Sequence, residues 1–366
     1  MTKMHEATKL GQSIWLDYMH RTMLKTGELK QLIDAGLRGI TSNPTIFEEA
    51  IGSGDAYDDA MRKMVEQGKS VGEMYQGLVV EDIRNAADQL RPIYAESKGN
   101  DGYVSLEADP NLAYDSWATV EEVHHLRELV DRPNVMFKVP ATGAGIPAIS
   151  QLISEGININ ITLMFSLNHY EAVADAYLRG LEKWAAKGEE LSQVASVASF
   201  FVSRVDTLID KELEKLGQRD LKGKIGIANA KMAYARYLTI FSSERWQQLE
   251  RQGARPQRIL YGSTSTKNPD YPDTLYIDNL MGANTVNTLP RKAIDALMDH
   301  GMIASGLTAN LDEARRQINQ LASLGLNLEV LTQHLQDEGV EKFAKDFSKL
   351  SDAIAKKREQ FQRVPA

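Results

Sequence analysis

The chain has 366 residues, of which 43% are hydrophobic and 25% are charged, an ordinary composition for a globular protein. Its formal net charge of -8 argues against broad affinity for nucleic acids, but leaves room for a local basic pocket that binds a phosphorylated metabolite. Because there is no cysteine, thiol nucleophiles, disulfides and thiolate metal sites are excluded.

The first residues, MTKMHEATKLGQS, lack the apolar core of a secretory signal, and no long apolar run suits a membrane span. We therefore expect a cytoplasmic protein with neither a membrane nor a nucleic acid as its partner. The seven histidines are scattered along the chain, so we expect no catalytic metal. The sequence leaves open whether the protein is a monomer or a homodimer.

Short apolar runs alternate with longer helical patterns, such as those at 166–187 and 228–250. This alternation predicts parallel strands joined by crossover helices, and eight such units in this length predict a single (β/α)8 (TIM) barrel over residues 1–366. A doubly wound sheet is the alternative, which the lack of a G-x-G-x-x-G motif after the first strand disfavours. The predicted strands are 13–19, 39–42, 102–108, 134–140, 156–164, 195–201, 258–264 and 284–289.

Two stretches go beyond a plain barrel. Residues 44–96, after the second strand, are expected to hold at least two helices, and the C-terminal 60 residues have no strand signal. We predict a helical extension at 325–366 that packs on the barrel. It is expected to lie against the outside rather than act as a lid, since an apolar stripe of this kind is usually core. The stripe, at spacings of three and four, consists of Val340, Phe343, Phe347, Leu350 and Ile354.

Polar residues alternate with apolar ones in the predicted strand GININITLM. Asn158, Asn160 and Thr162 share one parity, while Ile157, Ile159, Ile161 and Leu163 share the other, so the two sets point to opposite faces. A solvated antiparallel strand would produce the same pattern. In a barrel, however, the apolar set meets the helices and the polar set points inward.

Single charged residues near the ends of three other strands argue against the alternative of a solvated antiparallel strand. Asp17, Glu107 and Lys138 each stand among apolar neighbours, late in their strands. Buried charges need partners or a purpose, and the sites of (β/α)8 barrels lie at the C-terminal strand ends. Structural ion pairs remain an alternative. Three such charges at one end of one barrel favour a functional site.

The residue types suggest class I aldolase chemistry. A lysine in an apolar site loses its proton more easily, because desolvation disfavours the ammonium, and the neutral amine can form a Schiff base with a carbonyl. The protonated imine then accepts electrons from a neighbouring carbon–carbon bond. Asp17 and Glu107 are candidate proton shuttles, and Asn160 and Thr162 are candidates to hold hydroxyls and a water.

At these residues the chain closely resembles the transaldolase family. The matching stretches, in family order, are IWLD, GITSNPTIF, SLEADP, FKVPAT, ININITLMFS and SFFVSRVD, and the resemblance covers nearly the whole chain. It implies transfer of a dihydroxyacetone unit in the non-oxidative pentose phosphate pathway. The donor would be sedoheptulose 7-phosphate or fructose 6-phosphate, and the acceptor glyceraldehyde 3-phosphate or erythrose 4-phosphate. It also implies no cofactor, because the lysine itself supplies the electron sink.

The resemblance implies a role for each of the four residues closest to the chemistry. Lys138 would form the Schiff base. Glu107 would transfer protons through a water held with Thr162, and Asp17 would deprotonate a donor hydroxyl during carbon–carbon cleavage.

It also implies a set of substrate-binding residues. Asn43 and Asn160 would bind sugar hydroxyls, and Arg204 would bind the substrate phosphate with Ser199 nearby. From the sequence pattern alone, Asn43 is an N-cap of the helix predicted to begin at Pro44.

The loop after the seventh strand departs from the family pattern, in which many members carry a serine and an arginine that bind phosphate. Here YGSTSTKNP has no arginine. Ser263 is the expected counterpart of the serine, and Lys267 could replace the arginine as a point charge without the bidentate fork. A solvated loop lysine is an equally good interpretation of Lys267.

Two alternative functions remain. One is a lyase like fructose-6-phosphate aldolase, which resembles this fold but is shorter and tends to carry glutamine at the position of Glu107. The other is a non-catalytic barrel that binds phosphorylated sugars. The intact Lys138, Asp17 and Glu107 argue against the latter.

Overall fold

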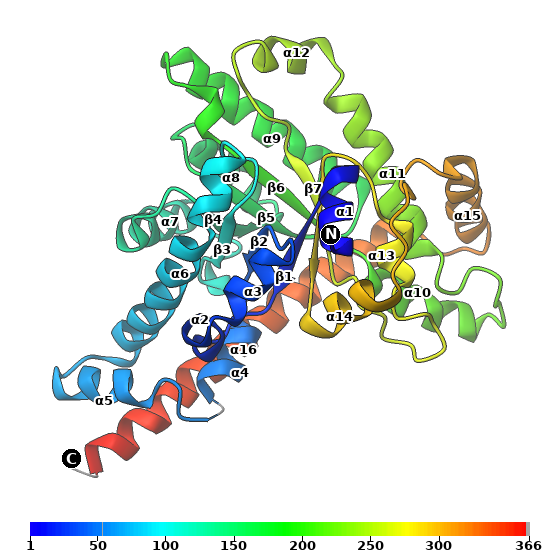
Figure 1. The fold of residues 1–366 in the computed structure, drawn as a ribbon. Helices are drawn as coiled ribbons and strands as arrows, with labels where there is room; N and C mark the ends of the chain where they lie inside the picture. The colour runs from blue at the N-terminus through cyan, green and yellow to red at the C-terminus, as the bar shows by residue number, and fades with distance from the viewer. Residues whose placement is uncertain (53, 364–366) are drawn as a thin grey trace.

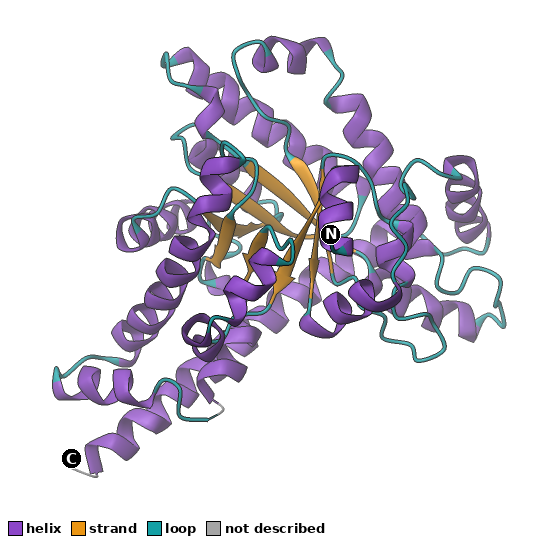
Figure 2. Cartoon of the chain, in the orientation of Figure 1, coloured by secondary structure: helices purple, strands orange, loops and turns teal. Residues whose placement is uncertain are grey.

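The computed structural model describes residues 1–52 and 54–363, and it confirms the predicted (β/α)8 barrel. All eight predicted strands form, and each pairs in parallel with the next until β8 pairs with β1 and closes the barrel. Figure 2 shows the strands enclosed by helices. The strands are β1 Gln12–Asp17, β2 Gly39–Thr41, β3 Tyr103–Glu107, β4 Val135–Pro140, β5 Ile159–Met164, β6 Ser196–Phe201, β7 Arg258–Gly262 and β8 Thr285–Leu289.

Helices precede, join and follow the strands (Figure 1). Before and between the first strands lie α1 Lys3–Leu10, α2 Arg21–Thr26, α3 Glu28–Asp34, α4 Pro44–Gly52, α5 Asp58–Glu66 and α6 Val71–Glu96. The middle of the chain contains η1 Pro110–Leu112, α7 Ser116–Val130, α8 Gly145–Ile153, α9 Leu167–Ala186, η2 Leu191–Gln193, α10 Ser203–Lys215, α11 Ile225–Ile240 and α12 Glu244–Glu250. The last part contains α13 Leu275–Asn279, α14 Arg291–His300, α15 Leu311–Ser323 and α16 Leu328–Arg363.

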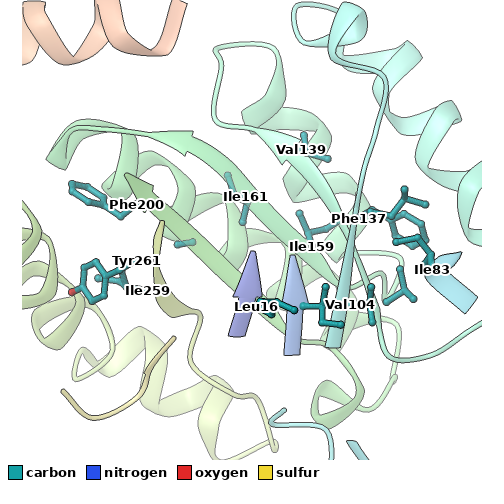
Figure 3. Close-up of a cluster of buried hydrophobic side chains, with 14 of the residues drawn as sticks. Leu16, Ile83, Val104, Phe137, Val139, Ile159, Ile161, Phe200, Ile259 and Tyr261 are labelled. Carbon is teal, nitrogen blue, oxygen red and sulfur yellow. The ribbon is translucent and has the colours of Figure 1, made fainter. Parts of the chain in front are cut away.

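The outer face of the barrel carries the main hydrophobic core. Leu16, Val104, Phe137 and Ile159 leave the strands on this face and pack with apolar side chains of the surrounding helices (Figure 3). Alternation along each strand sends the intervening side chains inward.

A second, smaller cluster fills the inside of the barrel, as inward-pointing side chains do in this fold. Its buried members are Trp15, Tyr103, Met136, Ala195, Val197, Leu260 and Val286. Met136 belongs to this cluster while Phe137 belongs to the outer one, so the parity that we inferred for β4 is confirmed and Lys138 shares the inner face.

A buried ionic network closes the N-terminal end of the barrel. The Arg258 Nη2 atom lies 3.0 Å from the Asp101 Oδ1 atom, and the Ser13 hydroxyl donates to the other Asp101 oxygen at 2.8 Å. All three side chains are buried. A buried charge needs a partner, and here the Asp101 carboxylate and the Arg258 guanidinium pair with each other. The opposite, C-terminal end of the barrel holds the polar residues that concern function.

The helices after β2 and at the C-terminus are additional to the barrel, as expected from the sequence. Residues 44–96 form α4, α5 and α6, and α16 contacts all three. In Figure 1, α16 runs from the barrel towards α5, where the C-terminus lies. None of the helices in the described part of the chain is both long and apolar enough to cross a membrane.

The apolar stripe of α16 has two kinds of neighbour. Leu350 and Ile354 join the main core, but Val340 and Phe343 pack in a separate cluster with Leu163 at the end of β5. This position at the C-terminal end of the strands differs from the packing on the outside of the barrel that we expected. The helical periodicity defines the apolar face correctly, but it does not say which surface covers that face.

Candidate active site

A cavity of about 290 Å³ opens at the C-terminal ends of the strands. It brings together eight of the ten residues singled out in the sequence: Asp17, Asn43, Lys138, Thr162, Ser199, Arg204, Ser263 and Lys267. The other two, Glu107 and Asn160, are buried and do not line the cavity. They lie on the strands that flank Lys138, because Glu107 and Asn160 are its register partners on β3 and β5.

Lys138 is nearly buried, with 5% of its surface exposed. Its Nζ atom donates to Glu107 Oε2 at 3.1 Å and to the backbone oxygen of Ser42 at 3.1 Å. The Phe343 ring centroid lies 5.8 Å from the same nitrogen. The amine is thus fixed by a carboxylate and a carbonyl at the wall of the cavity, beside an aromatic ring that shields it from water.

Glu107 is also buried. Burial raises the pKa of its carboxyl group, and the nearby Lys138 ammonium offsets part of that rise. A carboxyl with a raised pKa binds and releases a proton closer to neutral pH than an ordinary glutamate does, which suits general acid–base work.

Asp17 receives a hydrogen bond from Thr41 Oγ1 at 2.8 Å, and Thr288 Oγ1 lies 2.7 Å from that same Thr41 atom. Because Thr41 has a single hydroxyl proton and gives it to Asp17, Thr288 must be the donor in the second bond. Burial raises the pKa of Asp17, and Lys138 offsets part of the rise. Thr41 and Thr288 were missed in the sequence, where threonine at a strand end is too common to stand out.

Asn160 is held from both sides of its amide. It donates to Ser105 Oγ at 2.9 Å and accepts from Ser199 Oγ at 2.6 Å. The amide orientation is therefore fixed by side chains on β6, the adjacent strand, and on β3, one strand further away. Thr162 differs, because the residue lines the cavity and its buried Oγ1 atom finds no hydrogen-bond partner among the described residues. A buried hydroxyl of this kind normally binds a ligand or a water.

Asn43 caps a helix and also faces the cavity. Its Oδ1 atom accepts from the backbone nitrogen of Ile46 at 3.0 Å, which caps the start of α4. The residue also lines the cavity. The cap uses only the oxygen, so the amide nitrogen is the part that could bind a substrate hydroxyl.

A cationic wall lies on the β6–β7 side of the cavity. The Arg204 Cζ atom lies 5.2 Å from the Phe201 ring and 6.0 Å from the Phe343 ring, and no carboxylate among the described residues pairs with it. Burial lowers the pKa of Arg204, although an arginine stays charged at neutral pH. An unpaired, largely desolvated guanidinium is a typical site for a phosphate or carboxylate.

The loop after β7 adds hydroxyls and a second cation to this wall. Ser263 has a positive φ of 54°, and its Oγ atom lies 2.9 Å from that of Ser203, at the start of α10. Lys267 is exposed but lines the cavity, with its Nζ 3.3 Å from Ser265 Oγ. Ser265 was also missed in the sequence, where the run of serines and threonines in YGSTSTKNP was the available signal. Ser203, directly before Arg204 in SFFVSRVD, was missed as well.

No group of three or more histidine, cysteine, aspartate or glutamate side chains within residues 1–52 and 54–363 is arranged to hold a metal ion.

Comparisons with known proteins show the family of the chain. The profile of the family described as "Transaldolase/Fructose-6-phosphate aldolase" matches residues 14–354. The protein named "Transaldolase" of Thermobifida fusca is 47% identical over 357 residues, which cover 96% of this chain and 97% of the relative. The chain belongs to the transaldolase family.

Other transaldolases are similar over nearly their whole length. The one from Trichodesmium erythraeum is 44% identical over 366 residues, covering 96% of each chain, and the one from Mycolicibacterium smegmatis is 46% identical over 348 residues, covering 94% of each. The resemblance that we noted in the sequence is thus confirmed, and the chain is an enzyme of the transaldolase type, a transferase of aldehyde or ketone groups.

Proposed function

We propose that this transaldolase moves a dihydroxyacetone unit between phosphorylated sugars through a Schiff base on Lys138. The observation that carries the proposal is the buried Lys138 Nζ atom, 3.1 Å from Glu107, at the wall of a cavity that is also lined by Asp17 and Arg204. A nucleophilic amine, an acid–base carboxyl, a second base and an anion site are the parts that such a reaction requires.

Substrate binding comes first. Arg204 binds the phosphate of the ketose, together with the Ser263 hydroxyl and the Lys267 ammonium on the same wall of the cavity. On the sugar itself, Asn43 binds hydroxyls. Asn160 lies just behind the cavity wall, and its contribution to binding a hydroxyl goes through Ser199, which lines the cavity and donates to the Asn160 amide oxygen. These contacts place the carbonyl carbon of the ketose next to the Lys138 nitrogen.

Imine formation follows. Glu107 accepts a proton from the Lys138 ammonium, and the neutral amine attacks the carbonyl carbon. The carbinolamine then loses its hydroxyl as water, with the proton supplied by Glu107 through a water that Thr162 holds. The raised pKa of Glu107 fits a group that must first take and then give a proton.

Carbon–carbon cleavage uses Asp17. This carboxylate accepts the proton of the C4 hydroxyl, the C3–C4 bond breaks, and its electron pair flows into the protonated imine to form an enamine. The aldose phosphate leaves, and an acceptor aldose phosphate enters. The enamine carbon attacks the acceptor's aldehyde, Asp17 returns its proton to the new hydroxyl, and water hydrolyses the imine. The Thr288–Thr41–Asp17 chain orients the carboxylate for both proton transfers.

We further propose that residues 1–366 act as one catalytic domain, with 325–366 as its helical extension. The support is that α16 contributes Phe343 to the cavity wall. The enzyme is proposed to work in the cytoplasm as a monomer or a homodimer, without a cofactor, since the imine itself accepts the electrons.

A product assay tests transfer against simple cleavage. With fructose 6-phosphate alone, transfer predicts little free dihydroxyacetone, because the three-carbon unit stays on the enzyme. Adding erythrose 4-phosphate should give sedoheptulose 7-phosphate in multiple turnovers. Fast release of dihydroxyacetone without an acceptor would instead favour the lyase related to fructose-6-phosphate aldolase.

A further inference from the structure

Lys342, on the C-terminal helix α16, also lines the cavity. The helix is fastened close to this point, because the Gln336 side chain donates to the backbone oxygens of Ala141 at 3.0 Å and of Leu163 at 2.9 Å. Gln336 is itself buried. α16 is therefore tied to the ends of β4 and β5, and the residues one to two turns further on are held at the cavity.

The partner of Lys342 is a buried carboxylate that has other donors. Asp346 accepts from the Thr45 hydroxyl at 2.5 Å, from Lys349 Nζ at 3.0 Å and from Lys342 Nζ. Burial opposes ionisation of Asp346, but the donors, Lys342 first among them, lower its pKa to about 2. If Lys342 moves away, Thr45 and Lys349 still satisfy the carboxylate, so Lys342 can leave without stranding a buried charge.

The same stretch of α16 lies against the cationic wall that contains Arg204. A Cβ atom built on Gly339 would lie 3.7 Å from Arg204 Nη1, and the Phe343 ring is 6.0 Å from Arg204 Cζ. Lys342 stands between these two positions in the chain and is half exposed, with a long side chain that can reach into the cavity. A sugar phosphate carries up to about two negative charges at neutral pH, more than one guanidinium neutralises.

We propose that Lys342 is a further phosphate ligand, whose ammonium leaves Asp346 and binds the phosphate of the sugar substrate together with Arg204. This inference rests on the proposed function, because it assumes that phosphorylated sugars occupy the cavity. It makes the C-terminal helix part of the substrate specificity of the enzyme, since only a phosphorylated substrate gains from the added cation.

The chain offers a matched control for the test. Lys342 and Lys349 both pair with Asp346 from the same helix, but only Lys342 lines the cavity. We would compare Lys342→Gln with Lys349→Gln, measuring at low ionic strength the KM for fructose 6-phosphate and the Ki of inorganic phosphate as a competitive inhibitor. Lys342→Gln is expected to raise both constants roughly 5- to 10-fold. An effect of this size is larger than the loss of an exposed ion pair causes and smaller than the loss of a buried hydrogen bond to a charged group causes.

The control and a conservative variant distinguish a loss of phosphate binding from a general loss of structure around Asp346. Lys349→Gln is expected to leave the Ki of phosphate within about twofold of wild type, and Lys342→Arg is expected to restore most of the loss, because a guanidinium keeps the charge. Equal effects of Lys342→Gln and Lys349→Gln, or an unchanged Ki in Lys342→Gln, would overturn the inference. If Lys342→Gln still forms a borohydride-trapped adduct with fructose 6-phosphate while its Ki is unchanged, this inference fails and the proposed function stands.

Discussion

The Lys138 Nζ and Glu107 Oε2 atoms lie 3.1 Å apart, and both side chains are more than nine-tenths buried. Taking two charges out of water is unfavourable, and a buried pair of this kind seldom adds net stability. Because Lys138 lines the cavity, the pair supports the proposal that these two residues serve the chemistry more than the fold. The pair also gives the amine a proton acceptor at hydrogen-bonding distance.

Replacing that acceptor should remove most of the activity. We expect Glu107→Gln to lower kcat by roughly 100-fold or more, because general acid–base groups contribute about 10² to 10⁴ in rate and the amide cannot carry the proton. Steady-state kinetics with fructose 6-phosphate and erythrose 4-phosphate measure the effect, with thermal unfolding as the control for folding. A variant that unfolds like wild type and keeps its kcat would rule out Glu107 as the proton-transfer group.

Arg204 offers a test of the phosphate site. We expect Arg204→Ala to raise the KM for phosphorylated substrates by roughly 10- to 100-fold, since a hydrogen bond to a charged group contributes about 1.5–3 kcal/mol. Arg204→Lys should lie in between, because lysine keeps the charge but loses the bidentate fork. The matched control is Arg219→Ala at an exposed position outside the cavity. An unchanged KM in Arg204→Ala would remove this residue from the phosphate site.

The strands could be predicted from the sequence because each is a short apolar run between polar turns, and their alternation with helices specifies a parallel barrel. Parity then placed Lys138 inside. The same alternation gave the wrong face for Leu163, which we expected on the helix-facing side of β5 together with Ile161. A register shift between Ile161 and Met164, with φ of 58° at Leu163, turns that side chain towards Phe343 instead. Local spacing does not reveal such a bulge, because it arises from pairing with β6.

Asp17, Glu107 and Lys138 were also accessible from the sequence, since isolated ionisable residues in apolar strands stand out, whereas Arg204 and Lys267 were found only through the family resemblance. The parts contributed by distant segments were not accessible from the sequence. Phe343 and Lys342 reach the cavity only because α16 is fastened across the ends of β4 and β5 by Gln336, a contact between residues far apart in the chain. The role of Thr41 likewise could not be predicted, because it depends on the hydrogen bond to Asp17, a residue on another strand.

Another buried carboxyl, two residues after Arg204 in the chain, predicts a pH dependence of stability. Asp206 on α10 is 1% exposed and accepts from the backbone nitrogen of Gly226 at 2.6 Å. Burial, with a smaller contribution from Asp210, raises its pKa to about 7. In the unfolded chain this pKa is about 3.9. The stabilisation that the protonated group provides is therefore complete below about pH 4 and is lost as the pH rises through about 7.

Asp206→Asn should lack this dependence. The free energy of unfolding of wild type minus that of the variant is expected to fall by about 1 kcal/mol per pH unit between pH 5 and pH 7, and to level off above pH 8. Urea unfolding of both proteins at pH 5, 6, 7 and 8 measures the difference. A difference that stays constant over this range would show that Asp206 does not titrate there.

Reductive trapping tests most directly whether the Lys138 Nζ atom forms an imine with a ketose phosphate. Wild type is incubated with fructose 6-phosphate and sodium borohydride, and peptide mass spectrometry then locates the reduced adduct. We predict a covalent adduct on Lys138 in wild type and none in Lys138→Ala. No adduct in wild type, or a normal yield of adduct in Lys138→Ala, would contradict the account.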